Sequence, residues 1–204
     1  MGLKAKILLL TRDLDLAKFY RAHGLPSLRT RPTGFGTLIN IICGQQVSTA
    51  AARAITGRLG TIATPMTPEI FLSLSKKQIR KVGLSRPKEM YARGIAEVVL
   101  NGNFSFRKIA VMEDEAAIEE MTKLKGVGRW TAEVYLLFAL RRHDLWPVND
   151  LGVVKGLMGM KGLLERPSRR EMIEIGEHYR PWRSVAARMM WHHSNIFRGS
   201  GQTD

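Results

Sequence analysis

The sequence predicts an all-α protein, and three observations support that fold class. Apolar residues recur at spacings of three and four along most of the 204-residue chain, which is the period of an amphipathic helix. The segments with this pattern begin after residues that cap helices and end at glycine or proline. No segment alternates between apolar and polar residues for long enough to form a strand. We therefore expect helices joined by short turns, with no internal repeat and no long linker.

Capping residues set the limits of the expected helices. Thr67 followed by Pro68 is typical of a helix start. Ser48 and Ser75 are further N-cap candidates, and Gly83 marks a helix end. The expected helices span residues 14–23, 35–43, 49–59, 68–74, 76–82, 86–100, 113–121, 129–141, 151–158, 168–179 and 181–197.

The chain is strongly basic. It carries 32 Lys and Arg residues against 18 Asp and Glu residues, a formal net charge of +14. An excess of this size favours a polyanionic partner, with an affinity that falls as salt rises. An acidic membrane surface is the competing partner, but no Lys-rich helix has a bare apolar face and no apolar run could span a bilayer. Composition therefore favours nucleic acid as the partner, and we expect no membrane partner.

Two further features bear on the compartment. The apolar stretch at residues 4–10 is too short for a signal peptide, and no small-residue cleavage site follows it. The one cysteine, Cys43, excludes a disulfide within the chain and a cysteine-ligated zinc or iron–sulfur site. We expect Cys43 to be a buried apolar residue. We expect the protein to be cytoplasmic, associated with the nucleoid of a bacterium or archaeon.

A tight turn between two expected helices carries the first functional signal. Gly126 and Gly128 flank one apolar residue, and the helix from Arg129 follows at once. Glycine leaves backbone N–H groups accessible, and the positive end of a helix attracts phosphate. Lys125 and Arg129 would add full charges. The arrangement is a helix-hairpin-helix that would bind a nucleic-acid backbone; the alternative is an ordinary turn between core helices.

Four stretches together resemble a known family. The segment Leu124–Ala132, followed by Val148-Asn149-Asp150, resembles the signature of the helix-hairpin-helix (HhH-GPD) DNA glycosylase superfamily. Residues 44–48 and residues 181–191 resemble its DNA-3-methyladenine glycosylase II branch. The resemblance implies a two-lobed helical fold with the active-site cleft between the lobes. One lobe would be a six-helix barrel with the hairpin, at about 33–142, and the second would combine about 1–32 with 143–204.

The resemblance assigns the catalytic role to Asp150. Breaking an N-glycosidic bond develops positive charge on the deoxyribose, and a nearby carboxylate stabilises that charge. The same carboxylate could orient or deprotonate the attacking water. The alternative reading is a helix N-cap, since Asp150 precedes an apolar helical pattern. Both roles can hold together.

The resemblance also implies a pocket for the damaged base. Trp130 stands where relatives that cleave the DNA backbone have a Schiff-base lysine, and an indole cannot form that bond. Trp130, Trp191, Val134 and Tyr135 would line the pocket, with indole faces that suit a flipped cationic base. The family often has a tyrosine at the position of Val134, so the substrate range stays open. For Trp191 a core position is an equal alternative.

The expected DNA contacts lie in two turns. Gln46 matches the wedge, the side chain that such enzymes insert into the duplex in place of the flipped nucleotide; Gln45 is a near-equal candidate, and a plain polar turn is the alternative. The predicted DNA-binding residues are Gln45, Gln46, Lys125, Gly126, Val127, Gly128, Arg129 and Thr131. A structural Na⁺ or K⁺ could bind the main chain of Leu124 and Val127; no catalytic metal and no cofactor are expected.

We therefore expect a monofunctional DNA glycosylase of base excision repair, acting as a monomer on double-stranded DNA that contains damaged bases. It would release alkylated purines such as 3-methyladenine and 7-methylguanine and leave an abasic site. Two alternatives remain at this point. One is a DNA-binding module without catalysis, and the other is a glycosylase for deaminated, etheno-modified or oxidised bases.

Overall fold

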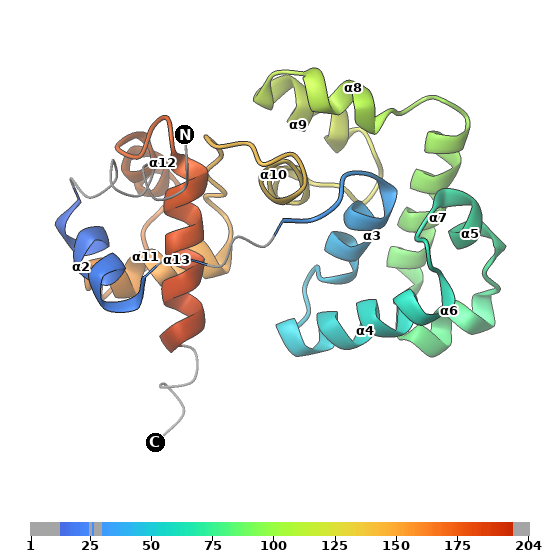
Figure 1. Cartoon of the computed structure of the whole chain (residues 1–204), viewed down its shortest axis with the longest axis horizontal. Coiled ribbons are helices and arrows are strands. Elements are labelled where there is room, and N and C mark those ends of the chain that lie inside the picture. Colours follow the sequence, from blue (N-terminus) through green and yellow to red (C-terminus); the bar gives the residue numbers. More distant parts are fainter. Residues whose placement is uncertain (1–12, 25, 27–29, 198–204) are drawn as a thin grey trace. The chain divides into compact units, whose positions relative to one another are not determined.

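The described part of the chain consists of helices joined by turns (Figure 1). A computed structural model describes residues 13–24, 26 and 30–197. No strand occurs among these residues, so the predicted all-α class is confirmed. The stretch at 4–10 lies outside the described residues. Within them, no helix has the length and apolar character needed to cross a membrane.

The chain divides into two compact units. Unit 1 contains the described residues of Met1–Arg29 and Arg141–Asp204. Its helices are α2 (Leu14–His23), α11 (Leu151–Lys161), α12 (Arg169–Glu177) and α13 (Arg183–Phe197). Unit 2 is Thr30–Leu140. Its helices are α3 (Phe35–Cys43), α4 (Thr49–Ile62), α5 (Pro68–Ser73), α6 (Lys76–Val82), α7 (Arg86–Leu100), α8 (Phe106–Val111), α9 (Asp114–Thr122) and α10 (Arg129–Phe138).

Local capping explains why the expected helix limits agree well with the structure. The Thr67 side chain accepts a hydrogen bond from the Ile70 N–H, with Pro68 at the first helical position. Ser75 forms a capping box with Gln78, and Gly83 ends α6 in the left-handed conformation. These signals lie within a few residues of one another and can therefore be read from sequence.

Four elements differ from expectation by three residues or more, and two of them, α4 and α11, run on to Ile62 and Lys161, beyond the expected ends at 59 and 158. Helix α8 was not expected, because its six residues are too few to display an amphipathic repeat. Its start is capped by Ser105, whose side chain accepts from the Lys108 N–H. Helix α10 ends at Phe138, not at 141, and Arg141 has a φ of 58° that cannot continue a helix.

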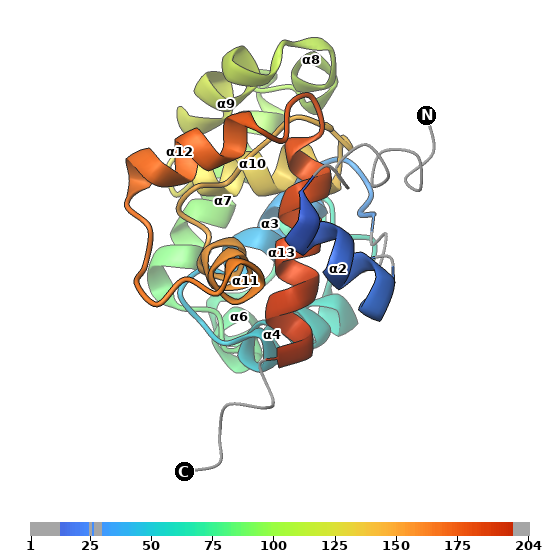
Figure 2. The same cartoon turned by 90° about the vertical axis from the view of Figure 1, so that its left-hand side faces the viewer.

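In unit 1, α11 and α13 lie side by side at close range (Figures 1 and 2). Three glycines of α11 make this approach possible. A Cβ at Gly156 would overlap with the Met190 carbonyl, and a Cβ at Gly159 would overlap with the His193 ring. Gly152, one turn before Gly156, faces Trp191 in the same way. The glycine face of α11 therefore fixes where α13 places its side chains.

In unit 2, α10 packs against α3 and α9. Tyr135, Leu136 and Leu137 on α10 are completely buried. Cys43, at the end of α3, is also completely buried, which confirms the prediction made for it. Burial raises the pKa of the Cys43 thiol to about 11, so the thiol stays protonated and unreactive at neutral pH.

Candidate active site and DNA-binding surface

Asp150 is held in place by three hydrogen-bond donors on one carboxylate oxygen. Its Oδ1 accepts from the backbone N–H groups of Gly152 at 2.8 Å and Val153 at 2.9 Å, so the predicted N-cap of α11 is confirmed. The indole N–H of Trp191 donates to the same oxygen at 2.7 Å. The residue is 9% exposed. The carboxylate thus has a fixed orientation at the positive end of a helix.

The sequence did not indicate that Gly152 is needed for this geometry. A Cβ at Gly152 would lie 2.6 Å from Cδ1 of Trp191 and 3.1 Å from Oδ1 of Asp150. Any larger residue would push the indole away from the carboxylate. A signal was present in the glycines at 152, 156 and 159, which share one face of α11, but the partner helix could not be read from it.

The expected hairpin is present between α9 and α10. Gly126 has a φ of 89°, and a Cβ there would overlap with the ring of Tyr91. Glycine is therefore required at 126 for both backbone conformation and packing. Gly128 is different, because its φ is −90° and a Cβ would meet nothing within 4 Å. Gly128 also begins α10 without any side-chain cap.

Three residues predicted to bind DNA serve the hairpin's own structure. The Arg129 guanidinium donates to both carboxylate oxygens of Glu115, at 2.8 and 2.6 Å, and to Glu133 at 2.9 Å. Hydrogen bonding to Glu115 is the main cause that raises the pKa of the Arg129 guanidinium. Arg129 therefore does not offer the uncompensated charge that we expected. Thr131 is 2% exposed, and Val127 is 4% exposed with its N–H bonded to the Leu124 carbonyl.

The pocket residues also require one correction. Tyr135 lies in the core of unit 2, where its hydroxyl accepts from the Gly34 N–H at 2.7 Å and its ring contacts Phe106. Burial raises the pKa of this phenol. A completely buried side chain does not line a surface that a base could reach. Trp130 is half-buried at the start of α10, and Val134 is buried one turn later; their place in the base pocket stays a prediction.

The turn at residues 44–47, here called the wedge turn, separates the two glutamine candidates. The Gln45 side chain is engaged, because its amide nitrogen donates to the Gly126 carbonyl at 3.0 Å and to Thr131 Oγ1 at 2.9 Å. Gln46 is exposed and has a φ of 52°. Gln45 is half-buried, so Gln46 is the more exposed of the two.

A cavity of about 520 Å³ lies between the wedge turn and the hairpin. Its lining includes Lys88, whose ammonium donates to the carbonyls of Cys43 at 2.9 Å and Gln45 at 2.7 Å. No sequence pattern indicated Lys88. Lys125 is exposed at the rim of the same cavity and makes no ion pair with any residue that the structure describes.

At the predicted cation site, the Leu124 carbonyl has one lone pair left for a cation. The Leu124 carbonyl accepts from the Val127 N–H at 3.0 Å, which uses one of its two lone pairs. Across the described ranges, no group of three or more His, Cys, Asp or Glu side chains could hold a metal. The monovalent cation stays a prediction.

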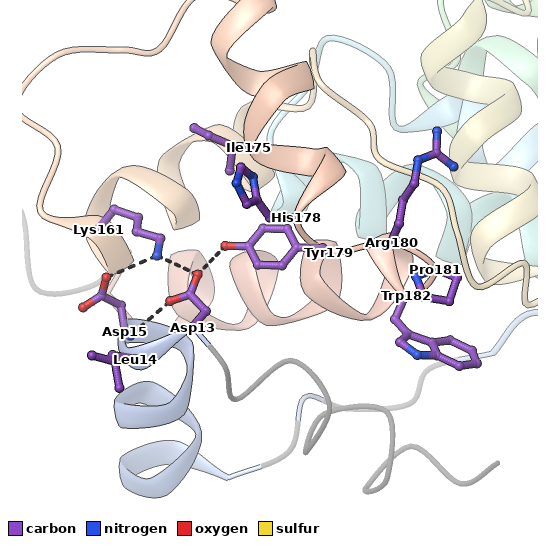
Figure 3. A pocket seen from close by; sticks show the side chains of 10 residues that line it. All are labelled: Asp13, Leu14, Asp15, Lys161, Ile175, His178, Tyr179, Arg180, Pro181 and Trp182. Atoms are coloured by element: carbon purple, nitrogen blue, oxygen red, sulfur yellow. Dashed lines mark hydrogen bonds and ion pairs between the residues drawn. The ribbon is translucent and has the colours of Figure 1, made fainter.

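A larger cavity, of about 830 Å³, lies in unit 1 and contains none of the predicted site residues (Figure 3). Lys161 pairs there with Asp13 at 2.6 Å and with Asp15 at 3.2 Å. The Tyr179 hydroxyl donates to Asp13 at 2.8 Å. These groups satisfy one another and tie the start of α2 to the end of α11, which indicates a structural role.

Comparison with known proteins gives a consistent result. The model of the HhH-GPD superfamily of base excision DNA repair proteins matches residues 39–181. DNA-3-methyladenine glycosylase 1 of Schizosaccharomyces pombe is 31% identical, over 78% of this chain and 72% of its own. A DNA-3-methyladenine glycosylase of Bacillus subtilis is 25% identical, over 85% of this chain and 60% of its own.

Solved structures agree with these relatives. The S. pombe 3-methyladenine DNA glycosylase (Mag1), solved in complex with abasic DNA, superimposes with a TM-score of 0.86 at 28% identity, covering 94% of this chain and 97% of that one. A DNA-3-methyladenine glycosidase from Bacillus halodurans gives a TM-score of 0.78 at 30% identity, covering 98% and 92%.

Proposed function

The chain belongs to the HhH-GPD superfamily of base excision DNA repair proteins, and on that premise we propose that it is a monofunctional DNA glycosylase acting on alkylated purines. The relatives reported above are named as 3-methyladenine DNA glycosylases. The expected reaction is hydrolysis of the N-glycosidic bond of a damaged nucleotide that has been turned out of the duplex. The products are the free base and an abasic site.

The observation that carries this proposal is the fixed carboxylate of Asp150. Loss of the base develops oxocarbenium charge on the sugar, and a negative charge preset at that position stabilises the transition state without reorganising. Three donors on Oδ1 hold the carboxylate in one orientation. The indole N–H of Trp191 adds a third donor to the two backbone groups that the helix cap uses.

The residue types at the site also limit the chemistry. Trp130 cannot form a Schiff base, so water is the nucleophile and the strand stays intact. 3-Methyladenine and 7-methylguanine carry positive charge and leave readily, so electrostatic stabilisation and extrusion suffice. Deaminated or etheno-modified adenines would need a general acid. We therefore propose cationic alkylated purines as the substrate class, with Trp130 and Trp191 as the predicted aromatic walls.

DNA binding is assigned to the surface of unit 2 that carries the hairpin and the wedge turn. Gly128 leaves the start of α10 open to a phosphate, because no side chain caps it and no Cβ blocks it. Lys125 adds an exposed positive charge beside it. Gln46 is proposed as the wedge, since its side chain is exposed while that of Gln45 is engaged.

Release of free base from methylated duplex DNA tests the proposal. Wild type should release methylpurines, and strand breaks should appear only after alkali opens the abasic sites. Asp150→Asn should abolish release and keep DNA affinity, because Asn caps a helix as well as Asp does. Glu165→Gln, which removes one exposed carboxylate from the same unit, is the matched control and should retain full activity.

The result that would overturn the proposal is DNA binding by wild type without release of any methylpurine. Release of other modified bases would then support a different glycosylase specificity. Absence of any base release would support the binding-module alternative. Strand cleavage without alkali would contradict the monofunctional reaction.

A further inference from the structure

The wedge turn contains a backbone conformation that must be held in place. Gln46 has a φ of 52°, in the left-handed region that residues with a Cβ rarely adopt. The residue is exposed, so its own side chain is not fixed by packing. Contacts from the neighbouring residues must therefore select this conformation over more favourable ones.

The first of these contacts comes from the Gln45 side chain. Its amide nitrogen donates to the Gly126 carbonyl at 3.0 Å and to Thr131 Oγ1 at 2.9 Å. Gly126 lies in the hairpin, and Thr131 lies in the first turn of α10. Gln45 therefore ties the wedge turn directly to the element assigned to phosphate binding.

The second contact comes from Lys88 on α7. Its ammonium donates to the carbonyls of Cys43 at 2.9 Å and Gln45 at 2.7 Å, at the end of α3 where the helix dipole is negative. Lys88 is half-buried, and desolvation lowers the pKa of its ammonium. A charged group placed in a partly dry site and bonded to two backbone carbonyls is a strong local constraint.

We propose that Gln45 and Lys88 are positioning residues that hold the wedge turn rigid against the hairpin, so that phosphate binding and insertion of Gln46 occur as one event. The contacts form a continuous path from Lys88 through the wedge turn to the hairpin. A turn whose backbone is already held in its inserting conformation has less ordering entropy to lose when its side chain enters the duplex. This inference rests on the proposed glycosylase function and on Gln46 as the wedge.

The experiment compares a lesion that must be extruded from a base pair with one that need not be. Single-turnover release of 7-methylguanine is measured from a duplex, opposite cytosine, and from the same strand unpaired. The variants are Gln45→Glu, which keeps the shape but loses both N–H donors, and Lys88→Met, which keeps the length but loses the ammonium. Lys88→Arg tests rescue by a conservative change. Lys81→Met removes one exposed charge from the same unit and is the matched control.

Gln45→Glu and Lys88→Met should each reduce release from the duplex by at least about 10-fold, because each removes two hydrogen bonds and one such bond to a charged or buried group is worth about that factor. Release from the unpaired strand should change by less than about 2-fold, because no wedge is needed there. Lys88→Arg should recover part of the duplex rate, and Lys81→Met should resemble wild type. Thermal unfolding of each variant shows whether it is folded. Equal losses on both substrates, or no loss on either, would overturn the inference.

A second readout does not need catalysis. Duplex DNA is made with a stable abasic analogue opposite 2-aminopurine, whose fluorescence rises when an inserted side chain unstacks it. At saturating protein, Gln45→Glu, Lys88→Met and Gln46→Ala should give a smaller rise than wild type and Lys81→Met. A full rise in the first two variants would overturn the inference. If wild type releases no base from either substrate, the proposed function fails, and this fluorescence measurement alone decides the role of Gln45 and Lys88.

Discussion

Two helix starts in this protein differ in how their first backbone N–H groups are satisfied. Helix α11 begins with Asp150, whose own carboxylate accepts from the first backbone N–H groups and from Trp191. Helix α10 begins with Gly128, which provides no side-chain cap at all. The same physical feature, a positive helix end, holds the proposed catalytic carboxylate in one unit and, in the other, carries no side-chain cap and is proposed to bind an external anion. Substitutions at one helix start should therefore change catalysis or DNA binding, but not both.

Giving α10 a cap of its own should have the largest effect. Gly128→Asp would place a carboxylate where the DNA phosphate is proposed to bind. The protein should fold normally, since the backbone at 128 has a φ of −90° and no atom lies within 4 Å of a Cβ there. Electrostatic repulsion should weaken duplex binding by about 100-fold at low salt. Titration of a labelled duplex measures this, with Gly128→Ala as the uncharged control; unchanged affinity in Gly128→Asp would refute the assignment.

Disturbing the support of Asp150 should have the next largest effect. In Gly152→Ala the added Cβ would displace the Trp191 indole, and the third hydrogen bond to Asp150 would be lost. Base release under saturating conditions should fall by about 10-fold, while stability should fall by about 1–3 kcal/mol. Single-turnover kinetics and urea unfolding measure the two quantities. Gly94→Ala, at a helical glycine with nothing within 4 Å of a Cβ, is the control: it should leave base release unchanged and raise stability slightly, by up to about 1 kcal/mol.

A second native capping carboxylate, Asp13 at the start of α2, accepts from the backbone N–H groups of Asp15 and Leu16 and gives a smaller, pH-dependent effect. Burial alone would raise the pKa of Asp13, but hydrogen bonds from Lys161 and Tyr179 outweigh it, and the pKa is lowered. A lowered pKa stabilises the fold above the unfolded value of about 3.9, and this stabilisation is lost as the pH falls through the folded value. Asp13→Asn should therefore cost about 1–2 kcal/mol at pH 7.

The pH dependence is the decisive part of that prediction. The difference in unfolding free energy between wild type and Asp13→Asn should shrink once the pH drops below about 4. Denaturant unfolding at neutral and acid pH measures it. A difference that does not change with pH would mean that the Lys161 and Tyr179 contacts act without regard to the charge of Asp13.

The smallest expected effect concerns a single exposed charge. Lys125→Met should weaken duplex binding by only a few-fold and should lower the slope of log affinity against log salt by about 1. Lys108→Met, which removes a charge already paired with Glu120, is the control and should alter the slope less. Equal slopes for wild type and Lys125→Met would place Lys125 away from the DNA backbone.

Features set by neighbouring residues could be predicted from the sequence, and features set by distant partners could not. The cap of α11 by Asp150 and the cap of α6 by Ser75 each depend on residues within three positions. The pairing of Tyr135 with Gly34 spans 101 residues, which is why Tyr135 was predicted at a pocket surface and lies in the core.

The same distinction applies to the candidate site. Gly126 and Gly128 predicted the hairpin because turn geometry is local. Arg129 was expected to face phosphate. Its pairing with Glu115 could not be predicted, because Glu115 lies 14 residues before it and the contact depends on how α9 packs on α10. Gln45 and Gln46 could not be separated until the contacts with Gly126 and Thr131 were known, since adjacent glutamines have the same local chemistry.

The contrast between the two helix starts is tested most directly by measuring affinity and single-turnover base release for Asp150→Asn and Gly128→Asp on the same methylated duplex. Asp150→Asn should bind as wild type does and release no base. Gly128→Asp should bind weakly but, at saturating protein, release base at close to the wild-type rate. Loss of affinity in Asp150→Asn, or loss of the saturated rate in Gly128→Asp, would contradict the assignment of catalysis to one helix start and phosphate binding to the other.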